Sequence, residues 1–405
     1  MAREMKDSGV QWIGEIPASW NLTQLKRFAV VNNGREVFEE TDNTEDAIPV
    51  YGSGGVFKYT ITPLFEGETV MFGRKGTLGK PIYVNEKLWT VDTMYYLTFS
   101  NELSAKFNYY QLTAFDWEPY ITHTALPSIV GSEIVSCQLA FPPINEQLQI
   151  VSFLDTECAR IDAVIEQTRS SIDEYGRLKQ SVIAQAVTKG VRPNRTLKPS
   201  GIEWVKELPD DWTVIPAKFL FRNSDTRKQD GDEQMTASQQ YGIITQERYM
   251  ELTGSKVVFA NKGLEDWKHV EPFDFVISLR SFQGGLEMSE TTGCITWHYI
   301  VLKPCKEVYS YYYKWLFKSE LYIKALQRTC NFIRDGQDLR YSNFIQVPLF
   351  EPSLAEQKEI AEYLNKKCAE IDELITQKER LLAELETYKK SLIYEYVTGK
   401  KEVPA

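Results

Sequence analysis

The sequence predicts an α+β protein with two mixed α/β blocks separated by two long antiparallel helices that form a coiled coil. Three observations lead to this fold class: one long helical stretch without breakers, its recurrence 210 residues later, and a short tryptophan motif that precedes each block. The order of motif, block and long helix therefore occurs twice. Such a duplicated frame indicates an internal repeat with pseudo-twofold symmetry.

The first long helix is expected from Asn145 to Thr188, a span of 44 residues or about 66 Å if straight. Apolar or small residues recur in it at alternating steps of four and three, which is typical of a heptad seam. A helix this polar on its other sides does not fold alone and needs a partner with the same seam. The seam positions are Leu154, Cys158, Ile161, Ile165, Ile172 and Tyr175.

The partner is expected in the same chain, because Pro142–Thr188 aligns without gaps on Pro352–Thr398 with 17 identities in 47 positions. Thr168 and Lys378 share one seam position, and a polar seam residue fixes register at some cost in stability. Two unrelated surface helices are the alternative, but these would not need a common register. The repeated seam is Leu364, Cys368, Ile371, Ile375, Leu382 and Leu385.

A second repeat precedes each block: Ser8–Trp20 returns as Ser200–Trp212 with six identities in thirteen positions. Two tryptophans around a proline predict a packed, extended connector, which we call the clasp. The expected division of the chain has four parts: 1–141 is the first block with its clasp, 142–190 the central helix, 191–349 the second block with its clasp, and 350–405 the C-terminal helix.

The two blocks share an order of elements but little identity. Residues 21–141 read as short strands broken by glycine turns, with a helix at 105–116. Residues 213–349 offer the strands YGIITQ, KVVFA, DFVISLRSFQGGLEM and GCITWHYIVLKP, followed by a helix around 310–328. A repeated frame with divergent blocks indicates one architecture that presents two different binding heads.

Composition argues against several classes of protein. The six cysteines form no Cys-x-x-Cys pair and there are only three histidines, so no zinc-finger spacing occurs. The charged start and the lack of an 18-residue apolar run predict neither a signal peptide nor a membrane span. Together these features predict a reduced, cytoplasmic protein. No dinucleotide or S-adenosylmethionine loop and no Asn-Pro-Pro-Tyr/Phe motif is present, so we expect no catalytic residue, cofactor or metal.

Net charge is −10, which argues mildly against a nucleic-acid partner. The first block has 9 basic and 14 acidic residues, and six of these acids lie within 36–46; the second block has 17 and 16. Local basic faces remain open in both blocks.

The remaining motifs are typical of binding sites. Glycine turns such as YGSGG and GRKGTLGK carry backbone N–H groups and basic side chains, which suit phosphate oxygens and base edges. In the second block SLRSFQGG and RDGQDLR place Arg and Gln beside glycines, and these side chains pair with guanine and adenine. Each loop could equally be an ordinary turn with exposed charge. The candidate DNA-binding residues are Ser53, Gly54, Arg74, Lys75, Lys80, His123, Arg280, Ser281, Gln283, Arg334 and Arg340.

The duplicated clasp, the duplicated Glu-Gln helix and the glycine blocks together resemble the specificity subunit of type I restriction–modification systems. The resemblance covers nearly the whole chain. It implies that the blocks are target recognition domains, each reading half of a bipartite, asymmetric double-stranded DNA site. It also implies that the helices form a spacer that docks two methyltransferase subunits, and that ATP-dependent restriction subunits join them.

Two other classes fit the sequence less well. A non-DNA scaffold could present two divergent heads on a coiled coil, and an enzyme could use an unrecognised site. The basic glycine loops argue against the first and the missing motifs against the second. DNA binding that weakens steeply with salt would separate them.

Overall fold

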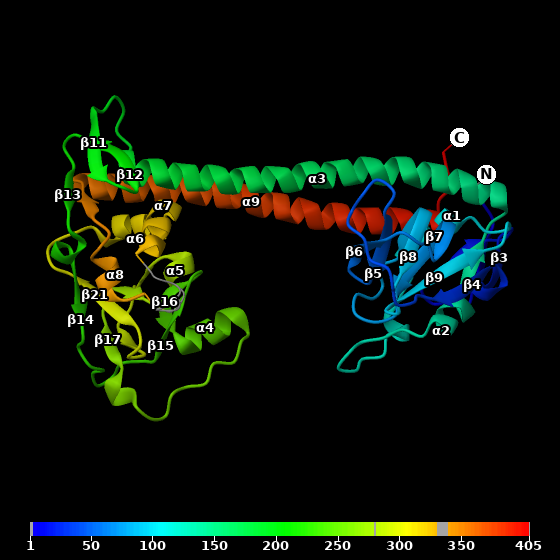
Figure 1. Cartoon of the computed structure of the whole chain (residues 1–405), viewed down its shortest axis with the longest axis horizontal. Helices are drawn as coiled ribbons and strands as arrows, with labels where there is room; N and C mark the ends of the chain where they lie inside the picture. Colours follow the sequence, from blue (N-terminus) through cyan, green and yellow to red (C-terminus); the bar gives the residue numbers. More distant parts are fainter. Residues whose placement is uncertain (1–2, 279–280, 330–338, 405) are drawn as a thin grey trace. The chain divides into compact units, whose positions relative to one another are not determined.

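The computed structural model describes residues 3–278, 281–329 and 339–404. It divides into two compact units: unit 1 is Met1–Ser170 with Glu379–Ala405, and unit 2 is Ser171–Lys378. The long helices α3 (Ile144–Lys189) and α9 (Leu354–Val397) each contribute to both units (Figure 1). Each unit therefore holds one globular block and part of each helix, and the expected four-part division remains a prediction.

Unit 1 is built on a six-stranded sheet in the order β4-β9-β7-β8-β5-β6. All its pairs are antiparallel except β5 with β8. Buried residues of β7 such as Val70 and Phe72 share one core with the helix residue Phe107. The strands are β4 (Ala29–Asn33), β5 (Ile48–Gly52), β6 (Gly55–Thr60), β7 (Phe65–Gly73), β8 (Ile82–Thr90) and β9 (Met94–Phe99).

Shorter elements connect this sheet to the rest of unit 1. Helix α1 (Ala105–Ala114) confirms the helix predicted at 105–116, and the Ser104 side chain caps it by accepting from the Phe107 N–H. Strand β3 pairs with β10, and β1 pairs with β2 inside the clasp. The remaining bounds are β1 (Met5–Asp7), β2 (Glu15–Pro17), β3 (Asn21–Gln24), η1 (Leu25–Arg27), η2 (Glu118–Tyr120), α2 (Gly131–Ser136) and β10 (Gln138–Phe141).

Unit 2 has smaller sheets. A four-stranded sheet runs β14-β21-β18-β19, and three two-stranded pairs join β13 with β22, β15 with β16, and β17 with β20; the clasp pairs β11 with β12. Its strands are β11 (Leu197–Ile202), β12 (Val205–Pro209), β13 (Thr213–Ile215), β14 (Phe221–Ser224), β15 (Met235–Ser238), β16 (Gly242–Thr245), β17 (Lys268–Val270), β18 (Phe275–Ile277), β19 (Glu287–Met288), β20 (Gly293–Ile295), β21 (Ile300–Pro304) and β22 (Leu349–Glu351).

The helices of unit 2 correct two predictions. The single helix expected at 310–328 is two helices, because Ser319 is extended, is 1% exposed, and caps the second one through the Tyr322 N–H. KVVFA is not a strand: the residues have no regular structure. The helices are η3 (Ala217–Phe219), α4 (Gln246–Thr253), η4 (Leu264–Asp266), α5 (Ser281–Gly284), α6 (Ser310–Lys318), α7 (Glu320–Arg328) and α8 (Tyr341–Phe344).

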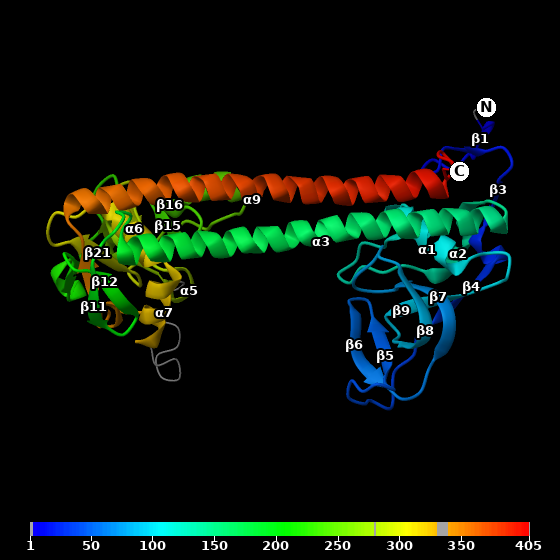
Figure 2. The same ribbon diagram turned by 90° about the horizontal axis from the view of Figure 1, so that it is seen from above.

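Within each unit α3 and α9 lie side by side and antiparallel, as both views show (Figures 1 and 2). In unit 1 the start of α3 shares a core with the end of α9; in unit 2 the end of α3 shares a core with the start of α9. The seam prediction is confirmed by burial. Leu154, Ile161, Ile165, Leu364 and Ile371 are buried, while Ile172, Ile375 and Leu382 are half-buried.

Ion pairs join the two helices in a repeated pattern. Lys179 contacts both oxygens of Asp372 at 2.6 Å in unit 2, and Lys389 contacts both oxygens of Asp162 at 2.7 and 2.6 Å in unit 1. The two lysines are one identity between the repeats and the two aspartates are another. The repeated sequence therefore forms the same bridge twice. At the polar seam position, Lys378 lies 5.8 Å from the Tyr175 ring centroid.

Exchanging the charges of one pair should be tolerated better than reversing one charge. We expect Asp162→Lys or Lys389→Asp alone to cost about 0.5–1 kcal/mol, because the carboxylate is 55% exposed and water screens it. The double exchange should recover most of this cost. A double-mutant cycle by urea unfolding measures the coupling, and the Lys179–Asp372 pair is its matched control. Additive costs would show that the pair does not interact.

The clasps attach each block to its helices through a buried tryptophan. The Trp20 indole N–H donates to Glu146 at 3.1 Å, and the Trp212 indole N–H donates to Glu356 at 3.1 Å. Both glutamates begin a long helix, and both belong to the repeated Glu-Gln. The adjacent glutamines accept a backbone N–H, from Ser104 and Tyr309.

The clasp repeat extends further upstream than its sequence motif. Arg3 contacts Glu146 at 2.7 Å, and Arg195 forms a salt bridge with Glu356. Burial disfavours the charged Arg195, but its hydrogen bonds and ion pairs with Glu356 and Asp211 outweigh this and raise its pKa. An arginine thus completes each clasp five residues before the serine that opens the motif.

Candidate nucleic-acid interface

Three loops of unit 1 meet at one site: the β5–β6 turn, the β7–β8 loop and the segment 121–130. Lys75 forms an isolated β-bridge with Ser128, and Thr122 bridges Ser128 in turn. The Arg74 N–H donates to the Thr93 carbonyl at 2.8 Å, and the Arg74 carbonyl accepts from the Ile129 N–H at 3.0 Å. The backbone around Arg74 and Lys75 is therefore held on both sides.

Glycine at position 76 permits this convergence. Its φ is +84°, and an added Cβ would lie 2.8 Å from the Ser53 hydroxyl oxygen. A side chain there would be both strained and too close to the β5–β6 turn. The structure thus brings Ser53 together with the loop that carries Arg74 and Lys75.

The predicted contact residues of unit 1 differ in solvent exposure and in their contacts. Lys75, Lys80 and Gly54 are exposed, whereas Arg74 and Ser53 are half-buried. The Arg74 guanidinium lies 5.8 Å from the Tyr95 ring centroid, a cation–π distance that restrains it.

His123 lies in the third loop and is exposed. It contacts Glu118 at 3.0 Å. Lys80 follows Gly79, which packs on Trp117. Together the three loops offer hydroxyl, amide, imidazole and cationic donors, which are the groups that bind phosphates and base edges. None of these groups forms the nucleophile–base pair that covalent catalysis needs.

In unit 2 the structure describes three of the five predicted residues. Arg280 and Arg334 lie outside the described residues. Gln283 is exposed on α5, and Arg340 is exposed just before α8, where its N–H donates to the Asn343 side chain at 3.0 Å.

The structure buries Ser281, which the sequence predicts as a DNA contact. Its side chain is 1% exposed, and its hydroxyl oxygen accepts from the Ser278 N–H at 2.8 Å. The residue instead holds the turn into α5 from inside, which leaves the neighbouring Gln283 to face solvent.

Sequence reasoning missed two features of the blocks. Thr122 and Ser128 join the β7–β8 loop only through backbone bridges, and no residue pattern signals these. In the exposed loop 254–263, the apolar and β-branched KVVFA predicts a strand that does not form. The flanking glycines at 254 and 263, both with positive φ, are the available signal of a loop.

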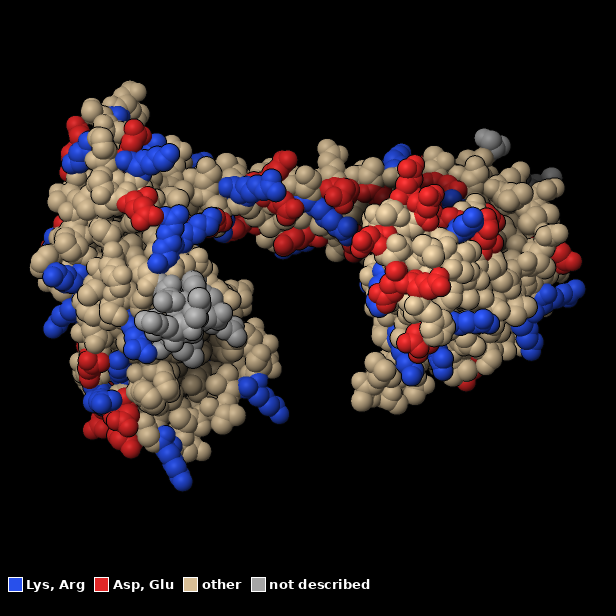
Figure 3. All heavy atoms as spheres, viewed as in Figure 1, with Lys and Arg blue, Asp and Glu red and all other residues tan. Residues whose placement is uncertain are grey.

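Charge on the surface is mixed. Figure 3 shows Lys and Arg side chains interspersed with Asp and Glu on both globular blocks, without a uniformly basic face in this view. Among the described residues no cluster of His, Cys, Asp and Glu could hold a metal ion. On the face shown, local donors are therefore better candidates for a DNA contact than a broad basic field.

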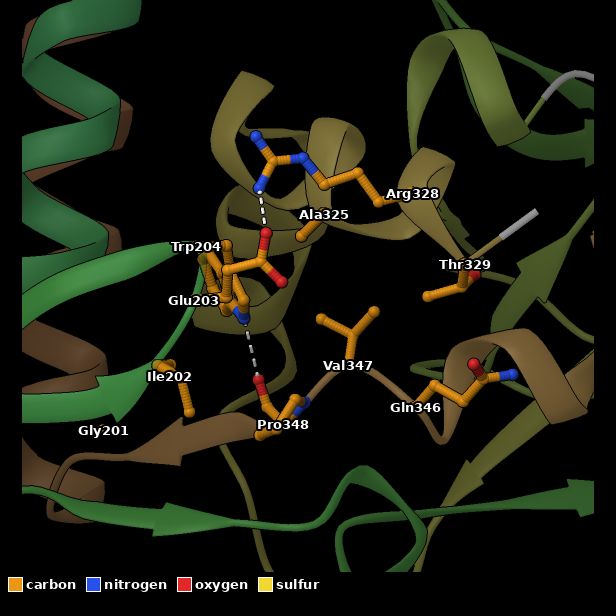
Figure 4. A pocket seen from close by; sticks show the side chains of 10 residues that line it. All are labelled: Gly201, Ile202, Glu203, Trp204, Ala325, Arg328, Thr329, Gln346, Val347 and Pro348. Atoms are coloured by element: carbon orange, nitrogen blue, oxygen red, sulfur yellow. Dashed lines mark hydrogen bonds and ion pairs between the residues drawn. The ribbon is translucent and has the colours of Figure 1, made fainter. Parts of the chain in front are cut away.

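A cleft lies beside the second clasp. It encloses about 390 Å³ between the clasp and α7 (Figure 4). Glu203 pairs with Arg328 at 2.9 Å across it, and the Trp204 indole N–H donates to the Pro348 carbonyl at 3.2 Å. The Glu203–Arg328 pair joins the clasp to α7 across the cleft.

Comparisons with known proteins find similarity to one family over part of the chain. Residues 17–173 match the type I restriction modification DNA specificity domain. The type I restriction enzyme MjaVIII specificity subunit of Methanocaldococcus jannaschii is 25% identical over 149 residues, which is 37% of this chain and 31% of that protein. Residues 17–173 are therefore similar to the DNA specificity domains of type I restriction–modification systems.

Solved structures agree in fold. A chain from a study of complex assembly and conformational transition of the type I R-M system superposes with a TM-score of 0.65 over 95% of this chain and 99% of that one. The HsdS subunit from Thermoanaerobacter tengcongensis gives 0.51 over 98% and 100%. Both are 14% identical, so they show the fold of this chain and nothing finer.

No described helix has the length and apolar character to cross a membrane. The sequence match spans about a third of the curated relative. The DNA target and the partners of this chain are therefore inferred from its own residues.

Proposed function

We propose that the chain reads a bipartite, asymmetric site in double-stranded DNA, one half-site with each globular block. The observation that supports it most is the contrast between frame and blocks. The frame repeats down to individual contacts, since Trp20 and Trp212 bond equivalent glutamates and the Lys–Asp bridges recur. The blocks instead differ in sheet order and in their loops.

A repeated frame offers two equivalent surfaces for two copies of one partner. We therefore propose that the helices and clasps dock two methyltransferase subunits and that ATP-dependent restriction subunits join this complex. The chain itself contributes recognition without catalysis, uses no cofactor, and works in the cytoplasm. The converging loops of unit 1 supply the donors for one half-site, and Gln283 and Arg340 supply donors for the other.

Binding to DNA should fall steeply with salt. If the interface neutralises about six phosphates, affinity should drop by about 10³-fold between 50 and 200 mM salt. Fluorescence anisotropy of labelled duplex, with the purified chain and its methyltransferase partner, measures this slope. The partner alone is the control. A salt-insensitive or absent interaction in the presence of the partner would instead favour the non-DNA scaffold.

The target is best found from the host. Sequencing methylated bases in a genome that carries this operon should give two half-sites separated by an unread gap.

Transfer of methyl groups by the isolated, highly purified chain would contradict the non-catalytic role.

A further inference from the structure

The proposed hydrogen-bond donors to DNA leave one exposed loop of unit 2 without a role. Residues 254–263 connect α4 to η4 and have no regular structure. Gly254 and Gly263 limit it, with φ of 67° and 72°. The loop therefore begins and ends where the backbone turns sharply, and both turns are available to glycine at little cost.

The loop exposes two adjacent apolar side chains. Val258 is 90% exposed and Phe259 is 42% exposed. Lys256 and Lys262 flank them and are also exposed, and no acidic residue lies between Glu251 and Glu265. Single exposed apolar residues are normal, but a Val-Phe pair between two lysines on a projecting loop is a surface that suits an anionic partner with an apolar interior.

The residue that follows the apolar pair is held by hydrogen bonds to the body of unit 2. The Gln234 side chain donates to the Ala260 carbonyl at 3.0 Å and accepts from the Ala260 N–H at 2.9 Å. Gln234 also accepts from the Gln246 N–H through its carbonyl and bridges Cys294, which is fully buried. Phe259 thus stands directly before a residue that is fixed to the core of unit 2.

We propose that Val258 and Phe259 form a wedge that inserts between stacked base pairs of the DNA bound by unit 2, with Lys256 and Lys262 on the flanking phosphates. This rests on the proposed function. Wedges of Phe, Leu, Ile or Met open base steps in other architectures, and the unstacking energy is recovered from the additional contacts that a kinked duplex allows. Two flanking cations fit the phosphates on either side of one opened step.

The wedge adds specificity without a hydrogen bond to a base. Pyrimidine–purine steps such as TA and CA unstack most easily, so insertion favours them over stiffer steps. The half-site read by unit 2 should then contain a flexible step at the position of insertion. A protein surface is the other occupant of an apolar tip, and the experiment separates the two.

The test compares intact and already unstacked DNA. The double variant Val258→Ala, Phe259→Ala, in complex with the methyltransferase, should lose at least about tenfold in affinity for the intact target duplex. On duplexes with a single mismatch, placed at each step of the second half-site in turn, one position should reduce the loss to less than about threefold, because no unstacking remains to be driven there. Phe219→Ala is the matched control, since Phe219 is a 56% exposed phenylalanine of the same unit.

A second readout reports unstacking directly. 2-Aminopurine at the same step should brighten when the wild-type complex binds and should not brighten with the double variant. Equal losses on intact and mismatched DNA, no loss on either, or no brightening at any step would overturn the wedge. A wild-type complex that binds no DNA overturns the proposed function itself, whereas target binding with an unaffected double variant overturns the wedge alone.

Discussion

Replacing Glu356 with alanine is expected to lower the free energy of unfolding of unit 2 by about 3–5 kcal/mol. The Glu356 side chain is 1% exposed and accepts from both the Arg195 guanidinium and the Trp212 indole N–H. Removing it leaves the buried Trp212 N–H without its acceptor and takes from Arg195, which is 11% exposed, its buried partner, so that the exposed Asp211 must balance the cation. Water cannot replace a carboxylate in that position without opening the clasp.

The repeat provides the matched control. Glu146 makes the equivalent contacts with Arg3 and Trp20, but its side chain is 27% exposed. Glu146→Ala should therefore cost less, about 1–2 kcal/mol, because water can reach the abandoned partners. Glu356→Gln, which keeps an acceptor for Trp212 and loses the charge, should fall between the two.

Urea unfolding with native-state hydrogen exchange measures these losses of stability. Exchange at amides of α6 reports unit 2, and exchange at amides of α1 reports unit 1, so each loss can be assigned to its unit. Equal losses for Glu356→Ala and Glu146→Ala would contradict the argument from burial. A loss that appears in the other unit would contradict the assignment of the clasps.

The helical frame was predictable because its signal is periodic and duplicated. A seam at alternating steps of four and three fixes which side of α3 is buried, and Leu154 and Ile161 are indeed buried. The shared register also explains why the Lys–Asp bridge occurs twice, since Lys179 and Lys389 occupy equivalent positions. Periodicity cannot show which distant residue meets a helix start: Trp20 and Glu146 are 126 positions apart.

The blocks were less predictable because local propensity competes there with tertiary contacts. KVVFA has strand propensity, but the Gln234 side chain takes both backbone groups of Ala260 and leaves the loop outside any sheet. Tyr and Trp around 310–328 suggest one helix, whereas Ser319 ends α6 and caps α7. For the site, polar residue types found the β7–β8 loop, but they could not distinguish the exposed Gln283 from the buried Ser281.

The recognition loops should divide by half-site. Arg74→Ala should weaken binding by about 1–3 kcal/mol, or about 5- to 150-fold, if Arg74 contacts a base. The variant should also stop discriminating against changes in the half-site read by unit 1, while it keeps wild-type discrimination in the other. Gln283→Ala should show the reverse, because it lies on α5 of unit 2.

Four duplexes measure this separation: the intact target, one altered in each half, and one altered in both, each titrated with complexes of the two variants. Lys26→Ala is the control, since Lys26 is an exposed lysine of unit 1 on η1 and belongs to none of the three converging loops. Removing a cation that contacts no base changes the affinity for all four duplexes alike and leaves discrimination unchanged. If Arg74→Ala relaxed both half-sites equally, the blocks would not read independently, and the divergence between them would need another cause than two different targets.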